Sequence, residues 1–309
     1  MYSASPQTTR ADDAALKPEL HAARPAADTG LTVRQLKIDL SKGFARHWHG
    51  GDAFKSQHFN ALSMSFPSGE QSFIDAVREC VQLLPCTPDN EALHDTVAQF
   101  IGQEATHRHI HARYNAELAK QGLINGWEQR IAARLAFGHK RSIKPIHLLA
   151  ITAAYEHLTA VLSDYLLRID HVMAGADPAM RTLWRWHAAE ETEHRAVAFE
   201  LYQAMGGNYR WRLRWFIYAL VLFMADSGRQ TVNNLWHDGT LFKPATWWSA
   251  ARFYWGRNGM IWNCTGPLLA YFRRDFHPDQ EARRDPREHA KTLAQDWLKN
   301  NAGRFRVVR

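Results

Sequence analysis

The chain has 309 residues, of which 46% are hydrophobic and 22% are charged, a balance typical of a soluble globular protein with a sizeable buried core. Its three cysteines are odd in number and form no Cys-x-x-Cys pair, which argues against a disulfide framework and a cysteine-type zinc site and favours a reducing compartment. The net charge is +7, but no helix-turn-helix, zinc-finger or RNA-binding motif accompanies it, so nucleic acid is not an expected partner.

The N-terminal segment is rich in Ala, Pro, Asp and Thr and has no apolar core that could act as a secretory signal. We therefore predict a disordered tail over residues 1–30. No apolar run reaches the roughly 18 residues that a membrane span needs, since the longest candidate is WFIYALVLFMA at 215–225. These features predict a cytoplasmic protein.

Glycine and proline punctuation divides the middle of the chain into helical segments. We predict a first helix from near Ser68, a second from after Pro88 to about Lys120, a shorter one over 124–140, a third long helix from Pro145 to about His171, and a fourth from Asp177 to Gly206. Helices this long are typical of bundles. The predicted fold class is all-α: a ferritin-like four-helix bundle over residues 31–207, with additional C-terminal helices.

Beyond Gly207 the sequence predicts an apolar helix over about 209–228, a tryptophan-rich segment and a short helix near 286–300. Basic residues and tryptophans alternate between 208 and 258, where acidic residues are few. Such a stretch can cover a core or lie on a membrane surface. We predict that 208–309 is a Trp/Arg-rich extension packed on the bundle, with peripheral contact at the inner membrane face as the alternative.

Residues 186–194, WHAAEETEH, crowd ionisable groups onto the fourth helix. At about 100° per residue, His187, Glu191 and His194 share one stripe, with Glu190 beside it. This stripe continues the apolar face and therefore points inward. A buried carboxylate is costly unless it is paired, protonated or bound to a metal. The pattern favours a metal site; the alternative is a buried network of hydrogen-bonded histidines.

The second helix repeats the pattern in FIGQEATHRHIHARYN, where Glu104, His107 and His111 lie on its apolar face. A further Glu-x-x-His match, Glu91 with His94, falls on the far side of the same helix, and we predict that it is a surface feature.

Bundles that bind two metals also take one glutamate from each of the other two helices. Glu70 heads the apolar stripe of the first helix, and Glu156 lies within that of the third. The order E…ExxH…E…ExxH predicts a centre with two divalent ions, iron first and manganese or zinc as alternatives. Its predicted ligands are Glu70, Glu104, His107, Glu156, His187, Glu191 and His194. Four further residues are predicted to surround the ligands: His111, Glu190, Thr152 and Thr159.

At these residues the sequence resembles the ferritin-like di-iron carboxylate superfamily. The His-x-x-x-Glu-x-x-His pattern of His187, Glu191 and His194 is similar to that of the p-aminobenzoate N-oxygenases, a resemblance that implies the same seven ligands. The longer motifs FPSGEQSF, FIGQEATHRHIHARYN, ITAAYEHLTA and WHAAEETEHRAVAFELY more closely resemble a bacterial family catalogued as predicted metal-dependent hydrolases, over about residues 30–275.

Three functions fit this centre. The first prediction is a di-iron enzyme that activates O₂ to oxidise an apolar or aromatic organic substrate, with an electron donor as partner. The alternative is a di-metal hydrolase that activates a water between the ions. Such hydrolases rely on Asp and His from loops, whereas this donor set is rich in Glu and lies within helices. A non-catalytic metal-binding bundle is the third hypothesis, and assembly as a homodimer is compatible with the sequence.

Overall fold

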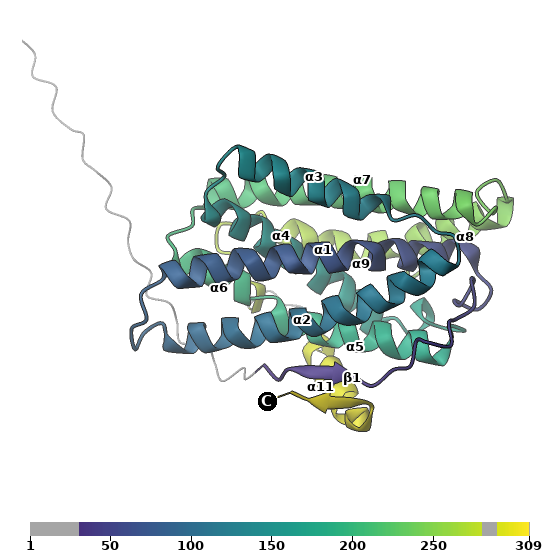
Figure 1. Ribbon diagram of the computed structural model, residues 1–309, viewed down its shortest axis with the longest axis horizontal. Coiled ribbons are helices and arrows are strands. Elements are labelled where there is room, and N and C mark those ends of the chain that lie inside the picture. The colour runs from purple at the N-terminus through teal and green to yellow at the C-terminus, as the bar shows by residue number, and fades with distance from the viewer. Residues whose placement is uncertain (1–30, 280–288, 309) are drawn as a thin grey trace, which may run out of the picture.

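The computed structural model describes residues 31–279 and 289–308, so the predicted tail at 1–30 lies outside the described residues. The prediction of an all-α helix bundle is confirmed (Figure 1). Its helices are α1 Ala53–Leu83, α2 Glu91–Lys120, α3 Gly126–Lys140, α4 Pro145–Arg168, α5 Pro178–His194, α6 Val197–Ala204, α7 Tyr209–His237, α8 Pro244–Trp255, α9 Met260–Ala270 and α11 His289–Asn300.

Helix α4 lies at the centre of the bundle and packs against α1, α5, α6, α7 and α9. By length and composition alone it is apolar enough to cross a membrane, but 61% of its most apolar window is buried inside the protein. Its hydropathy is therefore that of a core helix. Helices α1 and α2, joined by a short loop, lie side by side along the front of the bundle (Figure 1).

Helix α1 begins much earlier than the predicted start at Ser68, and that prediction was wrong. Asp52 caps the helix by accepting a hydrogen bond from the Lys55 N–H, and the helix continues through Pro67. A proline has no N–H for the carbonyl four residues before it, here that of Ser63. The side chain of Asn115 on α2 donates to this carbonyl at 2.9 Å instead. The neighbouring helix thus compensates for the proline, and two extra turns or more precede Ser68.

The fourth predicted helix is interrupted, which the sequence did not predict. Helix α5 ends at His194, and α6 begins at Val197. The buried Arg195 donates from Nε to the Thr192 carbonyl at 2.9 Å. In a continuous helix that carbonyl would accept the N–H of Ala196, so the arginine side chain takes the place of a backbone bond. The break falls directly after the last predicted ligand.

A small antiparallel sheet joins the two ends of the described chain. Strand β1 (Arg34–Leu36) pairs with β2 (Phe305–Val307), with Arg34 opposite Val307. Figure 1 shows the pair along the lower edge of the bundle, next to α2 and α5. Strand β1 packs on α2, while α11 packs on α4 and α5. Arg34 is thereby held against the side of the bundle.

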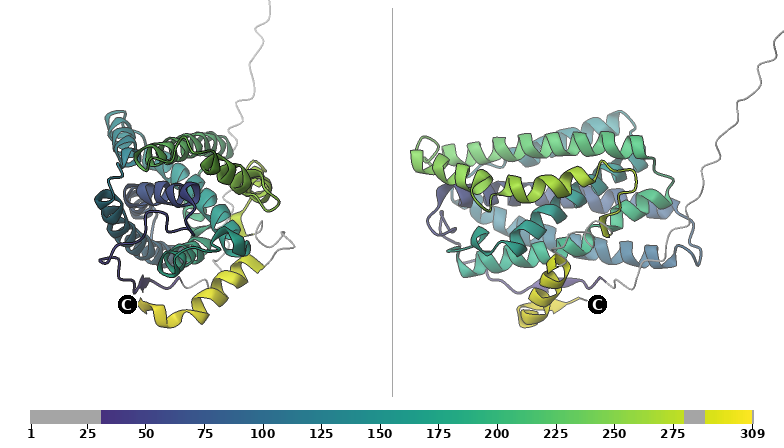
Figure 2. Two further views of the ribbon diagram at one scale, coloured as in Figure 1. Left: turned by 90° about the vertical axis from the view of Figure 1, so that its right-hand side faces the viewer. Right: turned by 180° about the vertical axis from the view of Figure 1, so that it is seen from behind.

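Residues 209–270 add a layer to the opposite side. Helix α7 packs against α1 and α4, α8 against α1, and α9 against α4 and α8. Seen from behind, α7 runs along the top with α8 and α9 below it (Figure 2). The predicted helix at 209–228 extends to His237, and the tryptophan-rich segment forms α8 and α9. Buried Asp226 of α7 pairs with Arg130 and Arg134 and ties α7 to α3.

Candidate metal centre

Four helices bring the seven predicted ligands to one place inside the bundle. Glu70 comes from α1, Glu104 and His107 from α2, Glu156 from α4, and the remaining three from α5. Each is at most 4% exposed. The potential ligand atoms form two groups, and within each group they lie within 4.8 Å of one another. The first group consists of Glu104, His107, Glu191 and His194. The second consists of Glu70, His107 and His187. Glu91 and His94 belong to neither group; Glu91 is exposed, whereas His94 is half-buried with its Nε2 enclosed.

Short distances join the two groups. His194 Nδ1 lies 2.8 Å from Glu104 Oε1 and 3.8 Å from Glu156 Oε2. Glu191 Oε1 lies 3.3 Å from His187 Nε2 and 3.4 Å from His107 Nδ1. The Glu191 carboxylate therefore stands between imidazoles of both groups, and His107 belongs to both.

Apart from contacts with one another, such as that of His194 Nδ1 with Glu104 Oε1, the donor atoms that face this centre have no hydrogen-bond partners. Both carboxylate oxygens of Glu70, Glu104 and Glu156 are buried without one, and so is Oε2 of Glu191. The inward-facing Nδ1 atoms of His107 and His194 are also buried without a hydrogen-bond partner. Buried polar groups are normally hydrogen-bonded, and an exception costs about 1–3 kcal/mol, more for a charged group. Divalent cations would satisfy all of these atoms at once, so the residues present fit a metal centre.

Crowding shifts the acid–base properties of the carboxyl groups. Burial, reinforced by neighbouring carboxylates, raises the pKa of Glu70 and of Glu156 well above the usual value. Burial also raises the pKa of Glu104, although His194 opposes the shift. For Glu191 burial acts in the same direction, but the adjacent imidazoles outweigh it and hold its pKa well below normal. Without cations the centre thus retains protons, and metal ions would take their place.

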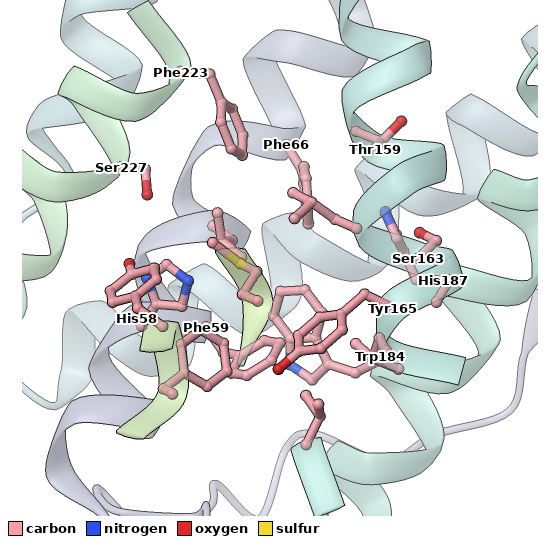
Figure 3. A pocket seen from close by; sticks show the side chains of 18 of the residues that line it. His58, Phe59, Phe66, Thr159, Ser163, Tyr165, Trp184, His187, Phe223 and Ser227 are labelled. Carbon is pink, nitrogen blue, oxygen red and sulfur yellow. The ribbon is translucent and has the colours of Figure 1, made fainter. Parts of the chain in front are cut away.

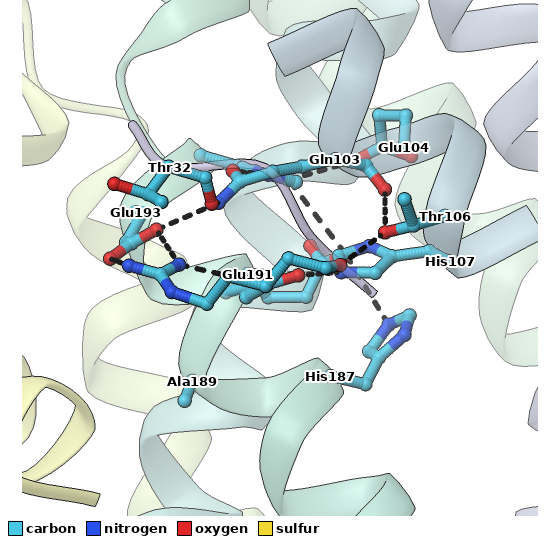
Figure 4. A network of polar contacts seen from close by, with 12 residues as sticks. Thr32, Gln103, Glu104, Thr106, His107, His187, Ala189, Glu191 and Glu193 are labelled. Atoms are coloured by element: carbon cyan, nitrogen blue, oxygen red, sulfur yellow. Dashed lines mark hydrogen bonds and ion pairs between the residues drawn. The ribbon is translucent and has the colours of Figure 1, made fainter. Parts of the chain in front are cut away.

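Hydrogen bonds behind the imidazoles fix how they face the centre (Figure 4). His107 Nε2 donates to Glu190 Oε2 at 2.8 Å, and Arg34 Nη1 donates to Glu190 Oε1 at 3.1 Å. His194 Nε2 donates to Gln103 Oε1 at 2.7 Å. These bonds leave Nδ1 of each imidazole directed inward, an arrangement typical of histidines that bind metals. Glu190 therefore lies directly behind His107, one of the predicted ligands.

Sequence reasoning missed three members of this outer network. Arg34 also contacts Glu193 Oε2 at 3.0 Å, and Gln103 Nε2 donates to the same oxygen at 2.9 Å and to the Thr32 carbonyl. Gln103 and Glu193 each directly precede a predicted ligand, and that adjacency was the only available signal. Arg34 lies on a strand far away in sequence, where no helical periodicity could identify it.

A second row of hydrogen bonds sets the protonation of His187. Asn115 donates to the Ser63 carbonyl, so its Oδ1 accepts from the Ser63 hydroxyl at 2.8 Å. The Ser63 oxygen must then accept from His111 Nδ1 at 2.9 Å, which leaves His111 Nε2 to accept from His187 Nδ1 at 3.1 Å. This order leaves the lone pair of His187 Nε2 directed at Glu191.

Burial and neighbouring imidazoles favour the neutral forms of this histidine pair. They lower the pKa of His111 well below normal and that of His187 to about 4. A neutral imidazole whose lone pair faces a carboxylate oxygen at 3.3 Å is repulsive unless a proton or a cation lies between them. His187 is thus suited to be a metal ligand, and His111 holds it in place.

The two predicted threonines bond to their own helix. Thr152 Oγ1 donates to the Leu148 carbonyl at 3.1 Å, and Thr159 Oγ1 donates to the Glu156 carbonyl at 3.1 Å. Thr159 also lines a pocket beside the centre.

This pocket encloses about 780 Å³ of space, including its open mouth, between α1, α4, α5 and the α7–α9 layer. Its walls are mostly aromatic and aliphatic, with the exceptions of His58, His187 and a few hydroxyl groups (Figure 3). Phe66 stacks on His187 with ring centroids 4.6 Å apart. The imidazole of His187 thus belongs both to the pocket wall and to the candidate metal centre, so the pocket reaches the ligand groups.

Comparison with known proteins found one matching family model. Residues 32–282 match a family model described as predicted metal-dependent hydrolase. No match was found among curated proteins or among solved structures. The matched range contains all seven candidate ligands and every helix that walls the pocket.

Proposed function

The chain belongs to the family of predicted metal-dependent hydrolases, and we propose that it is an enzyme that binds two divalent ions and hydrolyses an apolar small molecule. The observation that carries the proposal is the set of buried carboxylate oxygens without hydrogen-bond partners, which face imidazole nitrogens across a few ångströms. A protein that did not bind metal would gain stability by replacing such groups. Two groups of ligand atoms that share His107 support a pair of ions.

The two groups of ligand atoms indicate which residues would hold each of the two proposed ions. Glu104, His107, Glu191 and His194 would hold one ion, and Glu70 and His187 would complete the second with help from the shared groups. Glu156 lies next to the first group, since its Oε2 is 3.8 Å from Nδ1 of His194. When bound, the ions would supply Lewis-acid activation and stabilise developing negative charge.

The protein itself orients the three imidazoles and shields the centre from bulk water. The Arg34–Glu190 pair holds His107, Gln103 holds His194, and His111 holds His187. The apolar pocket walls exclude bulk water, which strengthens charge interactions at the centre. Phe66, stacked on His187, would hold the apolar part of a substrate against the centre.

Oxidation of the same kind of substrate by O₂ is the second candidate. The observation that favours it is the donor set, in which four glutamates and three histidines project from the interior of helices. Mixed carboxylate and imidazole ligands suit iron, and a pocket with few polar groups suits an unactivated organic substrate. This function would need an electron donor.

Metal loading separates the candidates. The chelated protein is reloaded without oxygen with Fe(II), Mn(II) or Zn(II), and bound metal is counted by elemental analysis. Two ions per chain with ester or amide cleavage under Zn(II) or Mn(II), and no O₂ uptake, support hydrolysis. Fe(II)-dependent O₂ consumption coupled to product formation supports oxidation. Many irons per chain would indicate storage, and no bound metal would refute both enzymes.

Variants provide the internal control. Glu104→Ala and Glu191→Ala should each abolish tight metal binding. Glu91→Ala in the same helix as Glu104 should leave the metal content unchanged, because Glu91 is exposed and outside both ligand groups.

A further inference from the structure

Helices α7, α8 and α9, and the loop between α7 and α8 that carries Phe242, present large apolar side chains to solvent. Phe242 is 82% exposed, Trp248 67% and Trp262 65%. We call the following residues the aromatic face: Trp236, Phe242, Trp247, Trp248, Trp255, Trp262 and Leu269, each at least 49% exposed. Apolar patches of this kind mark interaction sites, because single exposed side chains are common but contiguous groups are not.

Contacts link several members of the aromatic face. The rings of Trp236 and Phe242 lie 6.1 Å apart, and Trp247 donates to the Leu241 carbonyl next to Phe242. At the other end of α8, Trp262 of α9 donates to the Trp255 carbonyl at 3.1 Å. Since α8 carries both Trp247 and Trp255, it connects the two ends into one surface.

Helix α7 extends this surface with an aliphatic stripe. Ile217, Val221 and Met224 follow one another at helical spacing and are 49%, 59% and 48% exposed. The opposite side of α7, with Phe216 and Phe223, is buried against the bundle. A helix that is apolar on both sides needs a second partner on its outer side.

The exposed charges of this layer are of one sign. Basic side chains are exposed on it: Arg210, Arg214, Arg229, Lys243, Arg252 and Arg257. The two acidic residues of the same stretch are turned inward and paired. Asp226 contacts Arg130 and Arg134, and Asp238 contacts His47 at 2.7 Å. Between residues 208 and 258 the exposed charge is therefore positive.

We propose that the aromatic face and the α7 stripe bind the surface of an anionic lipid bilayer. Tryptophan rings favour the boundary between head groups and acyl chains, and Arg and Lys near the surface are attracted to anionic lipids. A second copy of this chain fits less well, because it would bring two basic faces together. Single-stranded nucleic acid would stack on the rings but leave the aliphatic stripe without a partner.

The pocket opens on the same face. Met224, Tyr254 and Met260 belong both to the pocket wall and to α7, α8 and α9 respectively. Met224 is 48% exposed, so it stands at the mouth. A docked protein would turn this mouth towards the membrane, and an apolar substrate could enter from the lipid phase. This last step rests on the proposed function, whereas membrane binding does not.

The test uses the full chain without added metal, so that its outcome is independent of catalysis. Protein is floated with vesicles of phosphatidylcholine alone or with phosphatidylglycerol, at low and high salt. We expect binding to the anionic vesicles at low salt and its loss at high salt, together with quenching of tryptophan fluorescence by brominated lipid. Trp248→Ser and Arg252→Glu should each weaken binding about fivefold or more.

Matched controls lie on the opposite side of the bundle. Val307→Ser on β2 replaces an apolar side chain that is 53% exposed, and Arg181→Glu on α5 reverses an exposed charge; neither should alter binding. Failure to bind anionic vesicles at low salt overturns the proposal, as does equal weakening by the control variants. Concentration-dependent dimerisation abolished by Trp248→Ser would assign the face to a second copy, and an RNA oligonucleotide that displaces the vesicles would assign it to nucleic acid.

Discussion

Replacing Glu156 by glutamine should change stability in opposite directions with and without metal. The side chain is 1% exposed, and neither carboxylate oxygen has a hydrogen-bond partner. Glutamine has nearly the same shape but carries no charge. In the metal-free protein the substitution therefore removes a carboxyl group that is unfavourable to bury and must hold a proton to stay neutral, whereas in the metal-bound protein it would remove a ligand.

The expected sizes follow from general magnitudes. An unsatisfied buried polar group costs about 1–3 kcal/mol, and since the amide remains partly unsatisfied, we expect metal-free Glu156→Gln to be about 1–2 kcal/mol more stable. Metal at about 100 times its Kd should stabilise the wild-type protein by about 2.7 kcal/mol and the variant by much less. For a chain of this length, about 1 kcal/mol corresponds to roughly 2 °C in Tm.

The difference should also depend on pH. The pKa of Glu156 is raised in the folded protein, chiefly by burial. Stability from a carboxyl of this kind is fully present below its unfolded pKa, about 4.3, and is lost as pH rises through the folded value. Glutamine does not titrate, so the advantage of the metal-free variant should be small near pH 4 and larger at pH 8.

Thermal unfolding followed by circular dichroism, with chelator or with Zn(II), measures all three effects. The reasoning fails if the chelated variant is less stable than the wild-type protein at pH 8, because Glu156 would then be a satisfied structural group. It also fails if added Zn(II) stabilises both proteins equally.

Four further outcomes are expected. Arg34→Ala should weaken metal binding about 10–100-fold in chelator competition and should alter the visible spectrum of the Co(II)-loaded protein. The reason is that Arg34 holds the carboxylates of Glu190 and Glu193. Glu190 orients His107 directly, and Glu193 orients His194 through Gln103. The double substitution Glu91→Ala and His94→Ala should leave metal content unchanged by elemental analysis. Ser163→Leu narrows the pocket and should reduce turnover of bulky substrates more than that of small ones, with metal content unaffected. Asp226→Asn loses its pairing with two α3 arginines, which should lower stability by about 1–3 kcal/mol in urea unfolding.

Helical periodicity was sufficient to select the candidate ligands. Glu104 with His107, and Glu191 with His194, continue the apolar faces of their helices, and burial of those faces brings the pairs together. A lone glutamate carries less information. Glu70 and Glu156 could be selected only because the two pairs already implied a four-helix arrangement, which the all-α bundle now supports.

The pocket could not be predicted in the same way, because part of its wall comes from residues 53–67, a segment that was not assigned to a helix. We expected the helix to start near Ser68, yet the preceding Pro67 is tolerated inside the helix because another group satisfies the carbonyl it leaves free. Here that group is Asn115, a residue of a different helix. The turns before Pro67 carry Phe59 and Phe66 into the pocket wall. Such tertiary compensation leaves no local signal.

The tryptophan-rich segment shows a related limit. From the sequence, its apolar residues could cover a core or meet a membrane, and periodicity cannot choose when both sides of a helix are apolar. The structure divides them: Phe216 is fully buried, while Trp248 and Phe242 are exposed. The buried residues of this layer therefore cover the core, and the exposed ones are those that we propose to meet a membrane.

The outer network links the two ends of the described chain to the centre. Strand β2 near the C-terminus pairs with β1, and β1 positions Arg34. Arg34 holds Glu190, which in turn fixes His107, the one imidazole that belongs to both ligand groups. Because metal affinity depends on how firmly ligands are oriented, a strand pairing outside the helix bundle contributes to a site that lies wholly within it. The sheet is short, but its position makes it part of the centre's support rather than a simple closure of the chain ends.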